Sequence, residues 1–177
     1  MYSVNSLYDL AAGVADPAQI INLRDHHRCH GDIVEFSNQS FYGGKLRVAT
    51  RYDRLKRPRN KEPGVVWQDV KGRTVRPGGG SAQNLPEAHA VIAALEDLLV
   101  DREYKGTVGV VTPFQAQAQL LKSLVSQHPI LSSMGSSAGL LIETVHLFQG
   151  DERDVMFFSP VISEGVQPGA LSFLRSN

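Results

Sequence analysis

The apolar positions of the chain predict short strands that alternate with helices. Apolar runs of strand length lie at residues 20–23, 64–70, 108–111, 140–142 and 155–158. Segments between several of these runs show apolar residues at the helical period, as amphipathic helices do. Strands that alternate with helices form parallel sheets whose faces are covered by those helices. The pattern therefore predicts an α/β domain in three layers, with a mostly parallel central sheet flanked by helices.

The first predicted helix covers residues 32–41. Gly43-Gly44 follows it directly, and glycine is a common helix terminator. Its expected buried face consists of Ile33, Val34, Phe36 and Phe41.

The longest predicted helix begins after Asn84. Asn84 can cap free backbone N–H groups, Glu87 can reach back three residues, and Pro86 is tolerated in a first turn. The expected core face is Leu85, Ala88, Val91, Ile92, Leu95, Leu98 and Leu99.

A third helix is expected after the buried strand at residues 108–111. Thr112 would cap this helix, which runs to about Gln127. Residues 132–139 are mostly small and are expected to form a loop. The ligand sites of such a sheet lie at the carboxyl ends of its strands.

Length and composition indicate one globular domain of ordinary size. The chain has 177 residues, 42% of them hydrophobic and 20% charged. No apolar run approaches the ~20 residues that a membrane helix needs, so no membrane association is expected. The single cysteine, Cys29, excludes an internal disulfide and predicts a cytoplasmic location.

Basic residues are concentrated in one part of a chain whose net charge is zero. Residues 45–76 carry eleven basic residues and three acids, a net charge of +8. Residues 45–84, which also include a Gly-rich stretch, have the character of an insertion. A basic segment can attract a polyanion, but it can equally be a solvated loop, and the sequence leaves both open.

The most specific stretch runs from residue 144 to residue 159 and reads TVHLFQGDERDVMFFS. Its polar loop offers a hydroxyl, an amide, a carboxylate and a glycine that a ligand can approach closely. The stretch resembles motif V of superfamily 1 helicases, in the branch that includes RNA-decay and DNA-replication helicases. The family form is roughly T-V-D-x-F-Q-G-x-E-x-D-V-V-x-x-S, and His146 stands here in place of the usual Asp.

This resemblance implies a role for four residues. Thr144 would contact a nucleic-acid backbone, while Gly150 and Glu152 would approach the ribose of a nucleotide. A carboxylate that accepts ribose hydroxyls is used in the same way in dinucleotide folds. Gln149 would link the two ligands.

A second stretch, LRDHHRCH at residues 23–30, resembles helicase motif IV. The family form is close to L-x-x-x-Y-R-M-H-P, and the continuation IVEFSNQSFY at residues 33–42 fits as well. The resemblance makes Arg28 the catalytic arginine finger, which reaches the terminal phosphate of ATP across a domain interface. A guanidinium suits this role because it stays charged and presents a planar fork of donors. His27 falls where the family has an adenine-stacking Tyr.

The same stretch has a second interpretation as a metal site. His26, His27, Cys29 and His30 are all possible zinc ligands. Four ligands within five residues cannot all point at one tetrahedral centre, and no second Cys/His pair lies at zinc-finger spacing. We therefore expect no metal site here.

A third stretch, TPFQAQ at residues 112–117, resembles the family element T-P-Y-x-x-Q, with Phe114 in place of Tyr. In relatives this element meets the nucleic-acid strand, which implies contacts from Thr112, Pro113 and Gln117. The beginning of a helix also presents free N–H groups to a phosphate.

Three family motifs are missing, and their absence defines the expected role of the chain. There is no G-x-x-x-x-G-K-[ST] phosphate loop and no acidic metal-binding strand motif of the helicase type, and the sequence stops before motif VI. The resemblance thus implies the second RecA-like domain of a larger P-loop NTPase-type helicase. ATP and Mg²⁺ would be held mainly by an upstream RecA-like domain, and the partner would be single-stranded DNA or RNA. The isolated chain would not hydrolyse ATP.

Two other functions stay open on the residues alone. Asp69-Val70-Lys71 at the end of an expected strand, with Asp53 upstream, is a D-x-K element like that of metal-dependent nucleases. The chain can also be a nucleic-acid-binding or interaction module that has kept the helicase fold and lost the motor.

Overall fold

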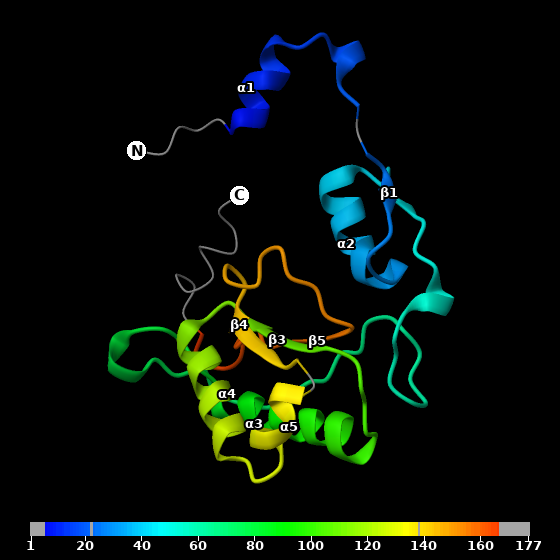
Figure 1. Ribbon diagram of the computed structural model, residues 1–177. Helices are drawn as coiled ribbons and strands as arrows, with labels where there is room; N and C mark the ends of the chain where they lie inside the picture. The colour runs from blue at the N-terminus through cyan, green and yellow to red at the C-terminus, as the bar shows by residue number, and fades with distance from the viewer. Residues whose placement is uncertain (1–5, 22, 138, 167–177) are drawn as a thin grey trace. The chain divides into compact units, whose positions relative to one another are not determined.

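A computed structural model describes residues 6–21, 23–137 and 139–166 of the chain (Figure 1). Contacts divide the chain into two compact units, an N-terminal unit, Met1–Asp53, and a C-terminal unit, Arg54–Asn177. No helix in the described part of the chain is both long enough and apolar enough to cross a bilayer.

The described part of the N-terminal unit contains two α-helices and a small parallel sheet. Its elements are α1 (Leu7–Val14), η1 (Pro17–Gln19), β1 (Asp25–His26), α2 (Gly31–Tyr42), β2 (Arg47–Val48) and η2 (Tyr52–Arg54), whose last residue is the first of the C-terminal unit. Strands β1 and β2 pair in parallel, with Asp25 opposite Arg47. The predicted strand at residues 20–23 is wrong for the described residues of that range. Ile21 and Leu23 are exposed, and the backbone pairs with β2 only from Arg24 onward.

Helix α2 confirms the prediction for residues 32–41, but not its buried face. His30 caps the helix by accepting a hydrogen bond from the backbone N–H of Asp32, and Gly43 ends it in the left-handed conformation. Val34 is buried, whereas Ile33, Phe36 and Phe41 are exposed. The apolar period of α2 therefore identified the helix correctly, but most of the expected core face is not buried.

The C-terminal unit contains the larger sheet. Strands β3 (Val108–Thr112), β4 (Leu141–Thr144) and β5 (Val155–Phe158) are all parallel and lie in the order β4-β3-β5. The helices are α3 (Leu85–Glu96), α4 (Gln115–Gln127) and α5 (Leu131–Ser137); a 3-10 turn, η3 (Pro77–Gly79), precedes them, and a π-helical turn, η4 (Asp97–Asp101), continues α3. The predicted α/β architecture, with parallel strands flanked by helices, is confirmed.

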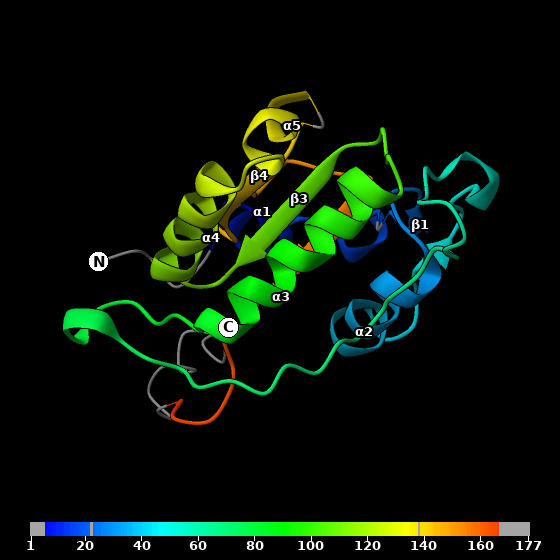
Figure 2. The ribbon, with the colours of Figure 1, turned by 90° about the horizontal axis from the view of Figure 1, so that it is seen from below.

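The core of the C-terminal unit lies between the sheet and its three helices. Val108 and Val110 of β3 pack in one cluster with Leu95 of α3, Leu121 of α4 and Leu131 of α5. The two ribbon views agree that α3, α4 and α5 lie against the same face of the sheet (Figures 1 and 2). Most of the predicted core face of α3 is buried, and Leu85 is the exception because it is exposed.

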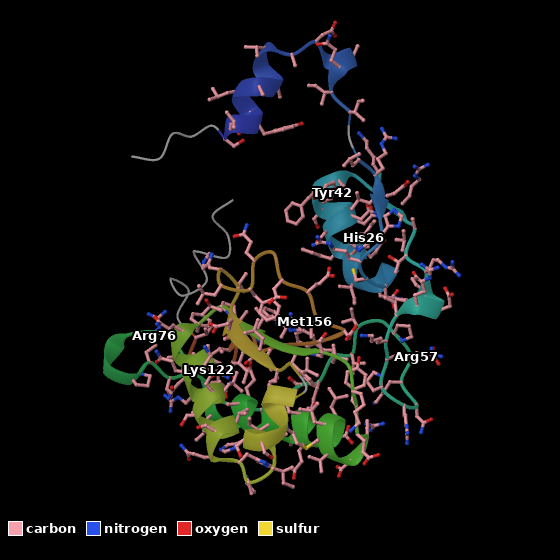
Figure 3. All side chains as sticks on the ribbon, viewed as in Figure 1. His26, Tyr42, Arg57, Arg76, Lys122 and Met156 are labelled. Atoms are coloured by element: carbon pink, nitrogen blue, oxygen red, sulfur yellow. The ribbon has the colours of Figure 1, made fainter. Side chains whose placement is uncertain are left out.

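The segment that joins β4 to β5, residues 145–154, contacts the opposite face of the sheet and contains no helix. Strands β4 and β5 are parallel, so residues 145–154 must return from the carboxyl end of the sheet to its amino end. A Cβ atom added to Gly109 would lie 2.7 Å from Phe148 and 2.6 Å from the sulfur of Met156, which Figure 3 labels on β5. Gly109 therefore lets this returning segment approach β3 closely.

Two segments of the C-terminal unit differ in secondary structure from the sequence predictions. Residues 64–70 form no strand, and Val65, Val66 and Trp67 are exposed. Residues 132–137 are helical and not a loop, because they belong to α5, which begins at the fully buried Leu131. The burial of one leucine outweighs the loop-forming composition of the small residues that follow it.

Candidate functional site

The carboxyl ends of β3 and β4 bring two predicted nucleic-acid residues together. Thr112 and Thr144 are opposite each other in the parallel register, and the backbone N–H of Val145 donates to the carbonyl of Thr112 at 3.1 Å. Thr144 is half-buried, and its carbonyl accepts hydrogen bonds from Leu147 and Phe148 as the chain turns. We refer to this place, formed by Thr112, Pro113, Thr144 and Val145, as the sheet edge.

Thr112 does not cap α4 as predicted. The N-cap residue is Phe114, whose side chain makes no capping bond, and the fully buried hydroxyl of Thr112 accepts from the backbone N–H of Phe114 at 3.3 Å. The backbone N–H of Ala116 donates to the hydroxyl of Ser81 at 3.1 Å. A serine 35 residues away in sequence thus satisfies the first turn of α4. The sequence did not predict that Ser81, which follows a Gly-rich stretch, would bond to the first turn of α4.

Gln117 is the centre of a buried hydrogen-bond network and is fully enclosed. Its amide nitrogen donates to the carbonyl of Asn84 at 3.2 Å and to the hydroxyl of Ser159 at 3.1 Å. Its amide oxygen accepts from the backbone N–H of Asn84 at 2.9 Å. In this arrangement the side chain is not available to a nucleic acid, and it joins the beginnings of α3 and α4 to the end of β5.

Glu87 extends this network, and its role differs from the predicted one. Asn84 caps α3 as expected, because its side-chain oxygen accepts from the backbone N–H of Glu87. The carboxylate of Glu87 does not return to the backbone N–H of Asn84, which is bonded to Gln117. It accepts instead from the hydroxyl of Ser159 at 2.6 Å and from the backbone N–H of Val161 at 3.0 Å.

The predicted nucleotide-binding residues of the C-terminal unit lie on the returning segment, residues 145–154, and not at the carboxyl edge of the sheet. Gly150 and Glu152 are exposed, and so is Gln149, a predicted nucleic-acid contact on the same segment. Gly150 has a φ of +88°, a conformation that L side chains rarely adopt, and nothing lies within 4 Å of its Cβ position. The backbone conformation therefore explains why this residue is a glycine, because there is enough space for a larger side chain.

Arg153 stiffens the returning segment beneath these exposed groups. Its guanidinium bonds to the carboxylate of Asp151, donates to the carbonyl of Glu152 at 2.8 Å, and lies 5.8 Å from the ring centre of Phe148. The hydrogen bond from Arg153, followed by one from the backbone N–H of Glu152, lowers the pKa of Asp151.

Asp154 anchors the other end of the returning segment at the amino end of β3. Its carboxylate accepts from the backbone N–H of Thr107 at 2.7 Å and from the Thr107 hydroxyl at 2.9 Å. Lys56 lies 3.7 Å from the same carboxylate. Burial, and then the charge of Asp154, raises the pKa of Tyr104 to about 12. Sequence reasoning assigned no role to Asp154, although it lies within the motif.

The residues of the second motif are held in the N-terminal unit, between β1 and α2. Arg28 and His27 are exposed. His27 lines a pocket of about 440 Å³ together with Leu23, Arg24, Asp25 and Arg47. Of its two guanidinium groups, that of Arg47 is paired with the carboxylate of Asp25 at 2.7 Å.

The other residues of that motif have structural roles. His26, labelled in Figure 3, has its Nε2 atom 3.0 Å from the sulfur of Cys29, and burial raises the pKa of this thiol. His30 stacks on Tyr52 with a ring-centre distance of 4.3 Å. Among the described residues, no three His, Cys, Asp or Glu side chains are grouped in a way that could hold a metal ion.

The nuclease interpretation assumed that Asp69 and Lys71 lie at the end of a strand, and the structure does not support this. Asp69 and Lys71 do not follow a strand, because residues 65–72 are irregular, and both side chains are exposed. Asp53 belongs to the N-terminal unit, where it is ion-paired with Arg51 at 2.9 Å.

Comparison with known proteins gives a consistent set of relatives. The family model described as the AAA domain matches residues 4–177. The chain is 29% identical to Helicase sen1 of Schizosaccharomyces pombe, over 89% of the chain and 9% of that protein. It is 26% identical to Putative helicase mov-10-B.1 of Danio rerio, over 90% of the chain and 17% of that protein. It is 27% identical to Uncharacterized ATP-dependent helicase MG140 of Mycoplasma genitalium, over 77% of the chain and 12% of that protein.

The chain thus spans less than a fifth of the length of each of these relatives. The match to the family model covers almost all of it, including the sheet edge and the returning segment. The chain therefore belongs to the AAA domain family and is homologous to the superfamily 1 helicases, in agreement with the RecA-like α/β fold that its motifs predict.

Proposed function

We propose that residues 1–177 form the second RecA-like domain of an ATP-dependent superfamily 1 helicase that acts on single-stranded nucleic acid. The observation that carries this proposal is the sheet edge, where Thr112 and Thr144 come from different strands into adjacent positions. Backbone groups and hydroxyls at the carboxyl ends of parallel strands are well placed to contact a phosphate backbone. The relatives, which are named as helicases, support the same assignment.

The residues predicted to contact nucleic acid differ in burial, so we propose that they have different roles. Pro113, Thr144 and Gln149 are half-buried or exposed and can meet the strand directly. Thr112 and Gln117 are fully buried. They would act by holding the sheet edge and the beginning of α4 in place, so that backbone groups face the phosphates.

The nucleotide would be shared with an upstream RecA-like domain. That domain would hold ATP and Mg²⁺, because the chain has no phosphate loop. Gly150 and Glu152, which are exposed on the returning segment, fit contact with a ribose. Arg28 would supply positive charge to the terminal phosphate, and His27 would stack on the base. The free thiol of Cys29 fits the cytoplasm as the location of the protein.

ATP turnover by the chain alone and by a longer protein that includes the upstream domain tests this proposal. The chain alone should show no activity above a contaminant control. The longer protein should hydrolyse ATP, and single strands should stimulate it. Arg28→Ala and Arg28→Lys should lower kcat by about 10³-fold or more, as loss of an arginine finger does, because lysine lacks the planar fork.

Arg51→Ala is the matched control, because Arg51 is an exposed arginine of the same unit that is ion-paired with Asp53. It should leave turnover unchanged. Turnover by the pure chain alone, or full activity in both Arg28 variants, would refute the proposal. A longer protein that binds single strands but hydrolyses no ATP would favour the module without a motor.

A further inference from the structure

Residues 54–71 concentrate positive charge on the surface of the C-terminal unit. This segment has two acids and six basic residues, a net charge of +4. All six basic side chains are exposed: Arg54, Lys56, Arg57, Arg59, Lys61 and Lys71. Figure 3 labels Arg57 on this loop. The segment contributes no strand or α-helix to the unit, so its charges are displayed by a loop.

The loop is attached to the domain through its backbone and not through its cationic groups. The hydroxyl of Tyr104 donates to the carbonyl of Lys56 at 3.4 Å, and Arg102 donates to the carbonyl of Arg59 at 3.2 Å. Between them, the backbone N–H of Lys61 donates to the carbonyl of Pro58 at 3.3 Å and closes a turn. Because carbonyl groups make the attachment, most of the cationic side chains stay available to a ligand.

Internal ion pairs neutralise only part of this charge. Arg57 pairs with Glu62 at 2.7 Å, and Lys56 lies 3.7 Å from Asp154. Arg54, Arg59 and Lys71 have no ion-pair partner among the described residues of the chain. Exposed cations without partners attract a polyanion and release its counterions when they bind it.

An exposed indole lies within the same segment. Trp67 is 79% exposed and stands between Arg59 and Lys71 in the sequence. Cations that hold phosphates next to an aromatic ring that can stack on a base are the usual means of binding single strands. A duplex keeps its bases stacked inside and offers no free base face, so a single strand fits this surface better.

The basic loop, residues 54–71, extends along the C-terminal unit from the amino end of β3 toward the beginning of α3. Lys56 lies beside Asp154, whose carboxylate is bonded to Thr107 at the amino end of β3. Thr112, at the sheet edge, is five residues further along the same chain, about 17 Å at a strand rise of about 3.3 Å per residue. The part of the basic loop around Lys56 is therefore at the end of β3 away from the sheet edge, whereas Lys71 precedes Gly72, whose Cβ position lies 2.5 Å from Asn84 at the beginning of α3.

We propose that residues 54–71 form a second binding site for single-stranded nucleic acid, in which Arg59 and Lys71 contact phosphates and Trp67 stacks on a base. This site is built entirely from its own residues and does not depend on the sheet edge or on ATP. It would hold a strand on the C-terminal unit while the contacts at the sheet edge are released.

Trp67 is the only tryptophan of the chain, so its fluorescence reports on this site alone. The full chain is titrated with a labelled oligothymidine, and the anisotropy of the label and the emission of Trp67 are followed together. We expect saturable quenching of Trp67. Arg59→Gln with Lys71→Gln should weaken binding and reduce the slope of log K against log salt by about 1.4, because each single-strand phosphate contact contributes about 0.7.

Three controls make the result specific. Lys45→Gln removes an exposed lysine from the N-terminal unit and should change neither signal. Thr144→Ala should leave the quenching of Trp67 in place, because Thr144 is not part of the basic loop. The duplex of oligothymidine with oligoadenine should quench Trp67 less than the single strand does.

The outcomes separate this inference from the proposed function. Binding that changes the anisotropy but leaves Trp67 emission unchanged would overturn the second site and leave the sheet edge as the binding surface. An unchanged salt slope in the double variant would also overturn it. Absence of any binding by the full chain would overturn it too, because the chain contains the whole site. The helicase assignment depends separately on ATP turnover by the longer protein.

Discussion

A single carboxylate, that of Asp154, ties several parts of the C-terminal unit together. It bonds the backbone and hydroxyl of Thr107 and faces Lys56 on the basic loop. Hydrogen bonds to a charged carboxylate are stronger than those between neutral groups. The same negative charge disfavours ionisation of Tyr104, whose hydroxyl is already partly buried. Asp154 thus holds the end of the returning segment in place and contributes to the raised pKa of Tyr104.

Tyr104 should lose its proton near pH 12, above the ordinary tyrosine pKa of about 10. Because the pKa is raised in the folded state, its contribution to stability is fully present below about pH 10 and is lost as the pH rises toward 12. Absorbance of tyrosinate against pH should show a last step that disappears in Tyr104→Phe. Tyr8→Phe should leave this step in place. A wild-type titration without any late step would contradict the assignment.

At the scale of elements, buried polar groups decide how the strands and helices are joined. The beginnings of α3 and α4 and the end of β5 meet around Gln117, whose amide satisfies both backbone groups of Asn84. Buried polar groups are costly unless they are bonded, so this network favours one arrangement of the three elements. On the other face of the sheet, packing depends on Gly109, because the absence of a side chain there makes room for Phe148.

Gln117→Ala should lower the free energy of unfolding by about 1–3 kcal/mol, because it leaves the buried N–H of Asn84 without a partner. Gln119→Ala is the matched control, since Gln119 is on the same helix and exposed. It should change stability by less than about 0.5 kcal/mol. Denaturant unfolding of both variants measures the difference. Equal effects of the two substitutions would show that the network contributes nothing specific.

At the scale of the whole molecule, the two units differ in how much core they contain. The main hydrophobic cluster consists only of residues of the C-terminal unit, with Leu95, Val108 and Leu121 among its fully buried members. Among the described residues of the N-terminal unit, only Val34 and Asn38 are buried. Burial of apolar surface is the main favourable term in folding, so the C-terminal unit holds most of the stability.

A truncated protein of residues 54–177 should therefore fold alone and unfold cooperatively. The helical circular dichroism should be lost in one transition on heating, with a calorimetric enthalpy equal to the van't Hoff enthalpy. Residues 1–53 alone should show no cooperative transition, because too little apolar surface is buried to offset the loss of chain entropy. Gradual unfolding of residues 54–177 would mean that the N-terminal unit is needed for the core.

The sequence by itself determined the family, the parallel α/β architecture and the positions of α2, α3, α4 and the three strands of the larger sheet. These follow from local pattern, because helical periodicity, short apolar runs and capping residues are properties of neighbouring positions. Motif resemblance also identified Thr112 and Thr144, and strand register brought them together. The failed predictions share one feature: each depended on packing or hydrogen-bond partners that are distant in sequence.

Only the tertiary structure decided which groups are buried and which partners they have. The exposure of Phe36, the enclosure of Gln117 and the capping of α4 by Ser81 all depend on residues distant in sequence. The path of residues 145–154 across the sheet depends on the strand order β4-β3-β5. Local sequence fixes the preferences of a segment, but the free energy of burial and hydrogen bonding is set by what the fold places against it.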